Sequence, residues 1–318
     1  MEDELDLAAI RSARERIAKY VLRTPVLRCA PRAGLELFLK AESLQPTGAF
    51  KLRGAFSLMT TLGPDCRGVV AHSSGNHAQA VARAARVLGL RAVIVMPDDA
   101  PALKRARTAA DGAEIVTVGS DSDLRARRAA EIAAAEGLAP VPPFDHPLVA
   151  AGQGTSALEL LEDTESLDRF YAPVSGGGLM AGCAVALHAL APAIELVAVE
   201  PEDANDTALS LAAGERRKIP PPRTIADGLR VRTPGELTFP VLARHVARVA
   251  LVSDGEMLEA MAFALRELRL VLEPSGAAAL AAALREGTGR TGVLLSGGNV
   301  DPALLARAES LARERLGP

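Results

Sequence analysis

Residues 68–85 read GVVAHSSGNHAQAVARAA, and this stretch decides which kind of fold the chain adopts. Gly68–His72 is a short apolar run of the kind found in buried strands, and the Ala-rich segment after it is typical of a helix. The residues between them, Ser73-Ser74-Gly75-Asn76-His77, form the turn. A strand that passes through a tight turn into a helix is half of a βαβ unit, so the stretch predicts an α/β fold.

The same alternation continues along the chain. Strands are expected at Glu36–Ala41, Gly68–His72, Ala92–Met96, Glu114–Val118, Phe170–Val174, Leu196–Glu200, Val249–Val252 and Val293–Ser296. Helices are expected at Gln79–Leu88, Leu103–Asp111, Leu124–Glu136, Gly182–Leu190, Gly255–Leu268 and Ala277–Glu286. This order favours parallel sheets flanked by helices, in which ligands bind beyond the carboxyl ends of the strands.

Two Pro-rich segments interrupt the pattern. Pro140-Val-Pro-Pro143 closes three strand–helix units that begin near Gly68, and these units predict a small lobe inserted into a larger lobe made by both chain ends. Pro220-Pro-Pro222 lies in a long connection, residues 205–238, that we expect to be a surface excursion near the site.

The composition narrows the class of protein. The chain has 318 residues, 49% of them hydrophobic, and a formal net charge of −3, which gives no reason to expect nucleic acid as a partner. Cys29, Cys66 and Cys183 lack CxxC spacing, which favours a reducing compartment over a disulfide framework. The acidic first residues do not resemble a signal peptide, and no apolar stretch reaches membrane-spanning length. We therefore expect a soluble cytoplasmic protein with no membrane partner.

Two of the predicted strand ends have the composition of anion-binding turns. In HSSGNH, residues 72–77, the backbone N–H groups at the start of the next helix and the side chains of the serines and Asn76 could bind a carboxylate, although capping of the helix alone is an alternative. In APVSGGGLMAG, residues 172–182, three glycines leave the backbone N–H groups open to a phosphate. No Gly-Lys-Ser/Thr follows, so this is not a Walker loop.

A third strand end and one lysine complete the pattern. VLLSGGNVDP, residues 293–302, ends a predicted strand at Ser296, whose hydroxyl is expected to face the cleft. In SLQPTGAFKLRGA, residues 43–55, a Pro-Thr-Gly turn is followed by Phe50 and Lys51, and a solvated lysine is the alternative interpretation. Together these features predict a ligand with a phosphate, a carboxylate and a carbonyl that forms an imine. Pyridoxal 5′-phosphate bound to an amino acid has all three groups.

These blocks, with AGQGT at 151–155 and the Glu-Pro pair at 273–274, resemble the fold-type II pyridoxal-phosphate enzymes. Within that group they are most similar to the threonine dehydratase and serine racemase branch, in matching order from about Thr24 to Asp301. The resemblance implies a two-lobed, tryptophan synthase β-like α/β fold, in which each lobe is a mostly parallel twisted sheet flanked by helices. Residues 1–50 and 147–318 would form the large cofactor-binding lobe, and residues 51–146 the small mobile lobe with the substrate-carboxylate loop.

The resemblance also implies a role for each site residue. Lys51 would be the Schiff-base lysine, Phe50 would pack under the ring, Asn76 would contact the phenolic oxygen and Ser296 the pyridine nitrogen. The phosphate loop would be Ser175, Gly176, Gly177, Gly178 and Leu179, where Ser175 departs from the glycine of many relatives. The substrate carboxylate would be held by Ser73, Ser74, Gly75, Asn76 and His77.

A cation site is implied as well. In VAVEPEDANDTA, residues 197–208, the pattern of the branch places Glu200 and Asp206 as carboxylate ligands and the Ala204 carbonyl between them. Such hard oxygen ligands suit Mg²⁺, Ca²⁺ or K⁺. A solvated acidic loop is the alternative.

The leading functional hypothesis is an ammonia-lyase that dehydrates L-threonine or L-serine to a 2-oxo acid and ammonia. A neutral Ser296 would leave the ring a weak electron sink, which suits a β-hydroxyl that departs soon after Lys51 takes the Cα proton. The resemblance further implies a homodimer or homotetramer.

Three alternatives stay open. An amino-acid racemase would use Ser74 as a second acid/base, and dehydratases carry this serine too. A 3-hydroxyaspartate dehydratase would need an extra cation for the distal carboxylate, and Arg230 and Arg232 are candidates unless they are ordinary surface arginines. A non-catalytic amino-acid- or nucleotide-binding α/β protein explains the glycine loops but gives Lys51, Phe50 and Ser296 no shared purpose.

Overall fold

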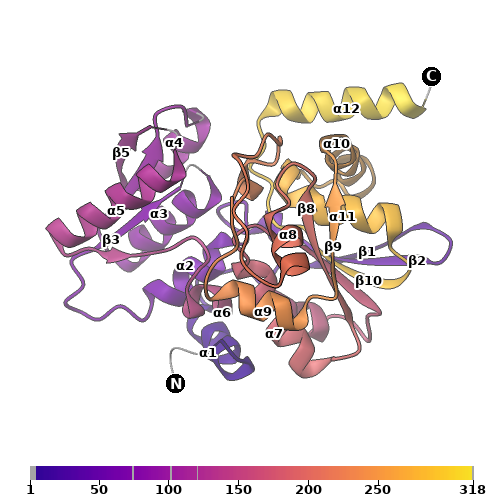
Figure 1. The fold of residues 1–318 in the computed structure, drawn as a ribbon, viewed down its shortest axis with the longest axis horizontal. Coiled ribbons are helices and arrows are strands. Elements are labelled where there is room, and N and C mark those ends of the chain that lie inside the picture. The colour runs from indigo at the N-terminus through magenta and orange to yellow at the C-terminus, as the bar shows by residue number, and fades with distance from the viewer. Residues whose placement is uncertain (1–4, 74, 101, 120, 317–318) are drawn as a thin grey trace.

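The computed structural model describes residues 5–73, 75–100, 102–119 and 121–316. Two separate β-sheets, each flanked by helices, lie side by side (Figure 1). All strand pairs in both sheets are parallel except the pair of the first two strands. The α/β fold predicted from the strand–helix alternation is therefore present.

The smaller sheet comes from the middle of the predicted small lobe. Its order is β5 (Glu114–Val118), β4 (Ala92–Pro97), β3 (Val69–His72) and β6 (Ala139–Pro140). Successive side chains of a strand point to opposite faces. One face therefore packs in a cluster with α2 (Lys51–Met59) and α3 (Asn76–Leu88), and the other packs against α5 (Ser122–Glu136). Helix α4 (Ala102–Ala110) lies beside α3.

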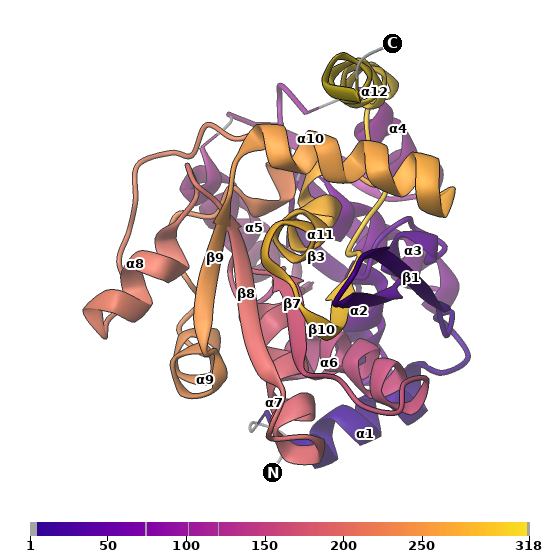
Figure 2. The same ribbon diagram turned by 90° about the vertical axis from the view of Figure 1, so that its right-hand side faces the viewer.

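The larger sheet comes from both ends of the chain. Its order is β1 (Val26–Arg32), β2 (Leu35–Lys40), β10 (Gly289–Leu294), β7 (Arg169–Pro173), β8 (Glu195–Pro201) and β9 (Arg248–Val252). One face carries α10 (Asp254–Phe263), α11 (Pro274–Glu286) and α12 (Pro302–Leu316). The other carries α1 (Leu7–Ile17), α6 (Pro147–Glu162), α7 (Gly178–Leu190) and α9 (Thr238–His245). Figure 2 shows strands β9, β8, β7 and β10 of this sheet next to one another, with α8 (Asp206–Ala213) beyond β9.

Helix α2 joins the two halves of the chain. It packs against α3 on one side and against α6 and α1 on the other. The contact with α6 is close because Gly152 has no side chain, and a Cβ there would lie 2.6 Å from the carbonyl oxygen of Arg53. The lobe boundaries at 50/51 and 146/147 remain predictions. Because α2 contacts helices of both predicted lobes, a movement of one lobe relative to the other would have to change the contacts of α2.

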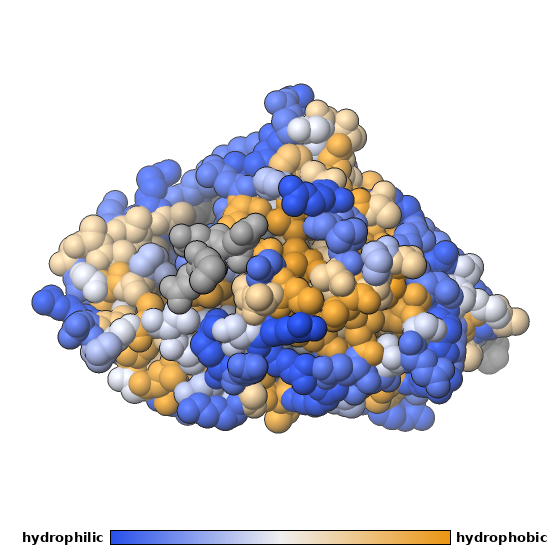
Figure 3. All heavy atoms as spheres, turned by 90° about the horizontal axis from the view of Figure 1, so that it is seen from below, coloured by the Kyte–Doolittle hydropathy of each residue, from blue (hydrophilic) through white to orange (hydrophobic). Residues whose placement is uncertain are grey.

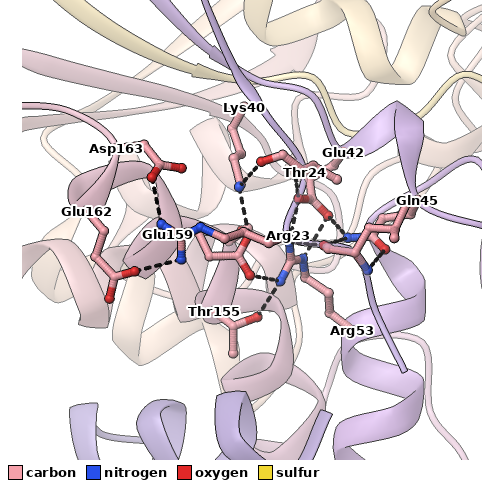
Figure 4. A network of polar contacts seen from close by, with 12 residues as sticks. Arg23, Thr24, Lys40, Glu42, Gln45, Arg53, Thr155, Glu159, Glu162 and Asp163 are labelled. Carbon is pink, nitrogen blue, oxygen red and sulfur yellow. Dashed lines mark hydrogen bonds and ion pairs between the residues drawn. The ribbon is translucent and has the colours of Figure 1, made fainter. Parts of the chain in front are cut away.

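A buried ionic network holds the first turn of α2 in place (Figure 4). The Arg53 guanidinium contacts Glu42 at 2.8 Å and Glu159 at 2.7 Å, and Lys40 contacts Glu159 at 2.7 Å. All four side chains are almost completely inaccessible to solvent. Burial would raise the pKa of Glu42, but the Arg53 charge and its hydrogen bonds outweigh burial and hold that pKa below its usual value. Two positive and two negative charges therefore compensate one another between β2, α2 and α6.

No helix in the described part of the chain is both long enough and apolar enough to cross a membrane. Apolar side chains instead gather on the underside of the molecule, near α1, α7 and α9 (Figure 3). Leu7, Val185 and Val241 of these helices are only partly buried, and Leu190 is exposed. This surface would suit the interface of a homodimer or homotetramer, which stays a prediction.

Candidate active site

A cavity of about 350 Å³ opens at the carboxyl ends of strands from both sheets. Its walls include His72 at the end of β3, Pro173 at the end of β7 and Ser296 just after β10. The predicted site residues that line it together are Phe50, Lys51, Ser73, Gly75, Asn76, His77, Ser175, Gly176, Gly177, Gly178, Leu179 and Ser296. Ser74 lies outside the described residues. Segments far apart in the sequence thus meet where the fold class predicted a ligand.

Lys51 is the first residue of α2, and its position in the cavity follows from the turn before it. Its Nζ donates a hydrogen bond to the Pro143 carbonyl oxygen at 2.7 Å and lies 5.0 Å from the centre of the Phe50 ring. Burial lowers the pKa of Lys51 to about 8, and no carboxylate in the described residues forms an ion pair with it. A sizeable fraction of the amine is therefore neutral near pH 7.5, as a nucleophile or base requires.

The loop between β3 and α3 has an open helix start. Gly75 is the N-cap residue, and no side chain of the described residues makes a capping hydrogen bond to α3. The hydroxyl of Ser73 accepts a hydrogen bond from the Gly75 N–H at 3.2 Å, so it orders the loop rather than the helix. Among the described residues Ser73 therefore does not cap the helix, and binding of a carboxylate by the N–H groups at the start of α3 stays a prediction.

His77 and Asn76 turn their polar atoms toward other parts of the site. The Nε2 atom of His77 lies 2.8 Å from the Val141 carbonyl oxygen. Burial and the nearby Lys51 charge lower the pKa of His77 to about 3, so the ring is neutral. Asn76 donates a hydrogen bond to Glu273 and accepts one from Asn299 at 2.8 Å.

The glycine loop before α7 needs its glycines for contacts inside the protein. Gly177 has φ +97°, and a Cβ there would lie 2.6 Å from Oγ1 of Thr238. A Cβ on Gly176 would enter the Phe144 ring, and one on Gly178 would lie 2.9 Å from the Phe144 carbonyl oxygen. The sequence interpretation, that the glycines clear space for an anion, therefore misses a second reason: Phe144 and Thr238 occupy the space that side chains at these positions would need.

The same loop offers unsatisfied donors. No side chain in the described part of the chain caps α7, so the N–H groups of its first turn lack a capping partner there. The Ser175 hydroxyl is buried and has no hydrogen-bond partner among the described residues. Buried polar groups are normally paired, so these orphaned groups fit a phosphate.

Ser296 and Glu273 form the far end of the cavity. Ser296 is 4% exposed, and its hydroxyl reaches the Ser275 carbonyl oxygen only at 3.4 Å, a weak hydrogen bond that leaves it free to serve a ring nitrogen. Burial and the nearby Asp227 charge raise the pKa of Glu273 to about 7. Sequence reasoning missed Glu273 as a cavity residue, although the Glu-Pro pair at 273–274 was one of the blocks that carried the resemblance.

Glu200, Ala204 and Asp206 lie apart from this cavity, at the end of β8 and the start of α8. The Glu200 carboxylate accepts hydrogen bonds from the N–H groups of Thr207 at 3.0 Å and Ala208 at 2.9 Å. Both carboxylate oxygens of Asp206 are buried without a partner in the described part of the chain. Burial raises the pKa of Glu200 to about 7, and burial together with the Glu200 charge raises that of Asp206 to about 8. Two buried carboxylates, one of them orphaned, fit a hard cation, although no cluster of three His, Cys, Asp or Glu side chains exists among the described residues.

Comparison with known proteins agrees with this geometry. The family described as "Pyridoxal-phosphate dependent enzyme" matches residues 17–297. L-threo-3-hydroxyaspartate ammonia-lyase of Saccharomyces cerevisiae is 43% identical over 92% of this chain and 92% of the relative. Serine racemase of Schizosaccharomyces pombe is 41% identical over 95% of this chain and 97% of the relative. A crystal structure of a threonine deaminase from T.th. has a TM-score of 0.89 at 45% identity and covers 93% of this chain and 99% of that chain. The chain therefore belongs to the pyridoxal-phosphate-dependent enzyme family and has its fold-type II architecture.

Proposed function

We propose that this enzyme is an ammonia-lyase that dehydrates a β-hydroxy amino acid to a 2-oxo acid and ammonia. The observation that supports the proposal is that one cavity contains Lys51, Ser296 and the N-termini of α3 and α7. L-threo-3-hydroxyaspartate takes first place among the substrates because two curated relatives named for it are 43% and 42% identical, against 36% for the curated L-threonine ammonia-lyase. The threonine deaminase structure at 45% identity keeps L-threonine as the next candidate. This order reverses the leading hypothesis from the sequence, which put threonine and serine first.

The residues of the cavity fit pyridoxal 5′-phosphate. Lys51 would hold its carbonyl carbon, the backbone of Gly176–Gly178 with Ser175 its phosphate, Phe50 its ring face, Asn76 its phenolic oxygen and Ser296 its ring nitrogen. When bound, the cofactor supplies an electron sink that acidifies the Cα proton of the substrate. Residues 73–77 would bind the substrate carboxylate at the start of α3. Lys51, whose pKa of about 8 leaves it partly neutral, would accept the Cα proton at Nζ.

A product assay tests this proposal. The holoenzyme is given L-threo-3-hydroxyaspartate, L-threonine or L-serine, and ammonia, 2-oxo acid and amino-acid chirality are measured. We expect 2-oxo acid and ammonia in equal amounts from at least one of the three. A D-amino acid as the main product would show that the enzyme is an isomerase and not a lyase.

An amino-acid racemase is the second candidate. Serine racemases of several organisms are 38% to 41% identical to this chain, so the family relationship supports this reaction as well. It would require an acid/base on the side of Cα opposite Lys51, and Ser74 remains the predicted group. The family assignment favours both reactions over a non-catalytic binding protein.

Glu200, Asp206 and the Ala204 carbonyl would bind Mg²⁺, Ca²⁺ or K⁺, and we expect this to appear as pH-dependent stability. Their pKa values of about 7 and about 8 in the folded chain lie above the ordinary values of 4.5 and 3.8. The folded state therefore binds more protons, so without a cation stability falls as the pH rises from about 4 to about 8. A cation at a hundredfold excess over its Kd should then raise Tm by about 5 °C at pH 8 and by much less at pH 5.

Thermal unfolding with MgCl₂, CaCl₂ or KCl measures this effect. Asp206→Asn should remove the response to the cation and flatten the pH dependence. Asp203→Asn, a change of the same kind at an exposed position of the same segment, serves as the control. A Tm that none of the three salts moves at pH 8 would show that these buried carboxylates bind none of these cations.

A further inference from the structure

One wall of the active-site cavity runs along the whole length of the predicted cofactor site. At one end of this wall, the Gly228 N–H donates a hydrogen bond to the Ser275 hydroxyl at 3.0 Å, and the Ser275 carbonyl oxygen accepts from Ser296. At the other end, the Gly235 N–H donates to the Gly176 carbonyl oxygen at 3.1 Å. Residues 228–235 therefore extend from the ring-nitrogen end to the phosphate end, and Arg230 and Arg232 lie between these anchors and line the cavity.

The cationic side chains of the cavity differ in whether a carboxylate lies close enough to neutralise their charge. Lys104 forms an ion pair with Asp227, and Lys218 forms one with Asp123 at 3.1 Å. Arg230 and Arg232 have no carboxylate within ion-pair distance in the described part of the chain. The wall thus presents more positive charge than its own acidic residues neutralise.

The two arginines are held differently. Arg230 is exposed, and its Nε and Nη2 both donate to the Thr224 carbonyl oxygen, at 2.8 Å for Nε. Arg232 is half-buried and uses only Nε, which donates to the Ile219 carbonyl oxygen at 3.0 Å, while the Ile219 N–H donates back to the Arg232 carbonyl oxygen at 2.8 Å. The two terminal nitrogens of Arg232 have no hydrogen bond to any described residue. Its guanidinium is therefore anchored at one end and open at the other.

Asp121 is an acidic residue whose pKa is lowered by the nearby Arg232 charge. The Arg232 charge is the smallest of several causes that lower the pKa of Asp121, behind hydrogen bonds from the Leu124 and Asp123 N–H groups. These hydrogen bonds, at 3.0 Å and 2.7 Å, direct the Asp121 carboxylate to the start of α5 as its N-cap. Asp121 therefore leaves the open donors of Arg232 unoccupied.

We propose that Arg232 binds the β-carboxylate of a dicarboxylic substrate and so determines the substrate specificity of this enzyme, an inference that rests on the proposed lyase function. A planar guanidinium with two free N–H-bearing nitrogens matches a carboxylate in bidentate geometry. Residues 73–77 would hold the α-carboxylate from the side of the smaller sheet, and Arg232 would hold the second carboxylate from the wall 228–235. L-Serine and L-threonine offer Arg232 no anion, and a site built to hydrogen-bond a group discriminates against analogues that lack it. Arg230 uses two of its nitrogens on the Thr224 carbonyl oxygen and so lacks the free pair of terminal nitrogens that Arg232 has.

The test compares Arg232→Gln with Arg230→Gln, which removes the same charge from the same segment. For Arg232→Gln we expect kcat/KM for L-threo-3-hydroxyaspartate to fall about 10- to 100-fold, while that for L-serine changes less than about threefold. Arg232→Lys should recover part of the loss, because it restores the charge but not the fork. Arg230→Gln should leave the ratio of the two kcat/KM values unchanged.

A binding measurement separates recognition from turnover. Succinate and butyrate have four carbons each, and butyrate has a methyl group where succinate has its second carboxylate. In calorimetric titrations of the holoenzyme, succinate should bind more tightly than butyrate, and Arg232→Gln should remove that advantage. A merely structural arginine would weaken both ligands equally or neither.

Several outcomes would overturn the proposal. Equal losses for all substrates in Arg232→Gln would assign this residue to the cofactor phosphate or to folding. Loss of selectivity in Arg125→Gln, with none in Arg232→Gln, would move the carboxylate site to α5, where Arg125 also lines the cavity. A wild-type enzyme that prefers L-serine would end the specificity claim and leave the lyase standing, whereas no 2-oxo acid from any β-hydroxy amino acid would end the lyase claim itself.

Discussion

Replacement of Lys51 by alanine should abolish turnover, with a loss of about a thousandfold or more in kcat. The amine is the one lysine nitrogen of the cavity that has no carboxylate partner among the described residues, since Lys104 and Lys218 are both ion-paired. Its surroundings lower its pKa to about 8. Alanine would remove both the proposed covalent attachment point and the proposed base. Arg53, two residues further along, cannot replace them because its guanidinium is held in the ionic network.

Two measurements check this result. The visible absorbance of the purified enzyme should be lost or shifted in Lys51→Ala, and 2-oxo acid formation should fall to the background rate. Lys19→Ala, an exposed lysine of the segment after α1, should change neither. A Lys51→Ala variant with the wild-type spectrum and more than a few per cent of its activity would show that another amine performs the chemistry.

Replacement of Arg53 by methionine should lower the free energy of unfolding by about 3–5 kcal/mol, because it leaves buried carboxylates without their main counter-charge. Glu42 would retain only hydrogen bonds from Thr24 and Gln45, and Glu159 only its contact with Lys40. Both carboxylates lie where water does not reach, so solvent cannot replace the guanidinium. Methionine fills much of the same volume, so the loss measures charge rather than a cavity.

Urea unfolding followed by circular dichroism gives the free energy. Arg128→Met is the matched control: Arg128 forms an exposed ion pair with Glu131, and its loss should cost well under about 1 kcal/mol. If the free energy of unfolding of Arg53→Met lies within about 1 kcal/mol of the wild-type value, we infer that Glu42 and Glu159 take up protons in the variant. In that case the loss should reappear as the pH is raised.

Much of the fold was predictable because most of its strands are apolar and alternate with helical segments. The expected strand Gly68–His72 and helix Gln79–Leu88 correspond to β3 and α3 within a few residues. β1 (Val26–Arg32) was not predicted, because Arg28, Pro31 and Arg32 break its apolar pattern and it lies at an edge where only one side is paired. The two-residue β6 is too short to leave any periodic signal.

The site could be predicted where it contains conspicuous local sequence, such as consecutive glycines. It was harder to predict where a residue matters because of the distant residues that pack against it. Consecutive glycines and a lysine after a turn stand out in a sequence, and the cavity unites them. Phe144, Thr238 and Glu273 do not stand out, because their importance comes from distant residues brought against them by the fold. Arg53 looks like an ordinary helix residue in the sequence, because the residues next to it do not indicate that it will be buried between β2 and α6.

Phe144 and Thr238 have a consequence for how the cofactor binds. Their atoms occupy the space that side chains on Gly176, Gly177 and Gly178 would need, and the Thr238 hydroxyl donates to the Gly176 carbonyl oxygen at 2.6 Å. The loop therefore takes its shape from the protein and not from the phosphate. If this loop holds the phosphate as predicted, a preorganised loop forfeits little conformational entropy when the cofactor binds, which favours tight binding. Trimming the Phe144 side chain, which also lines the cavity, should therefore weaken cofactor binding by letting the loop move.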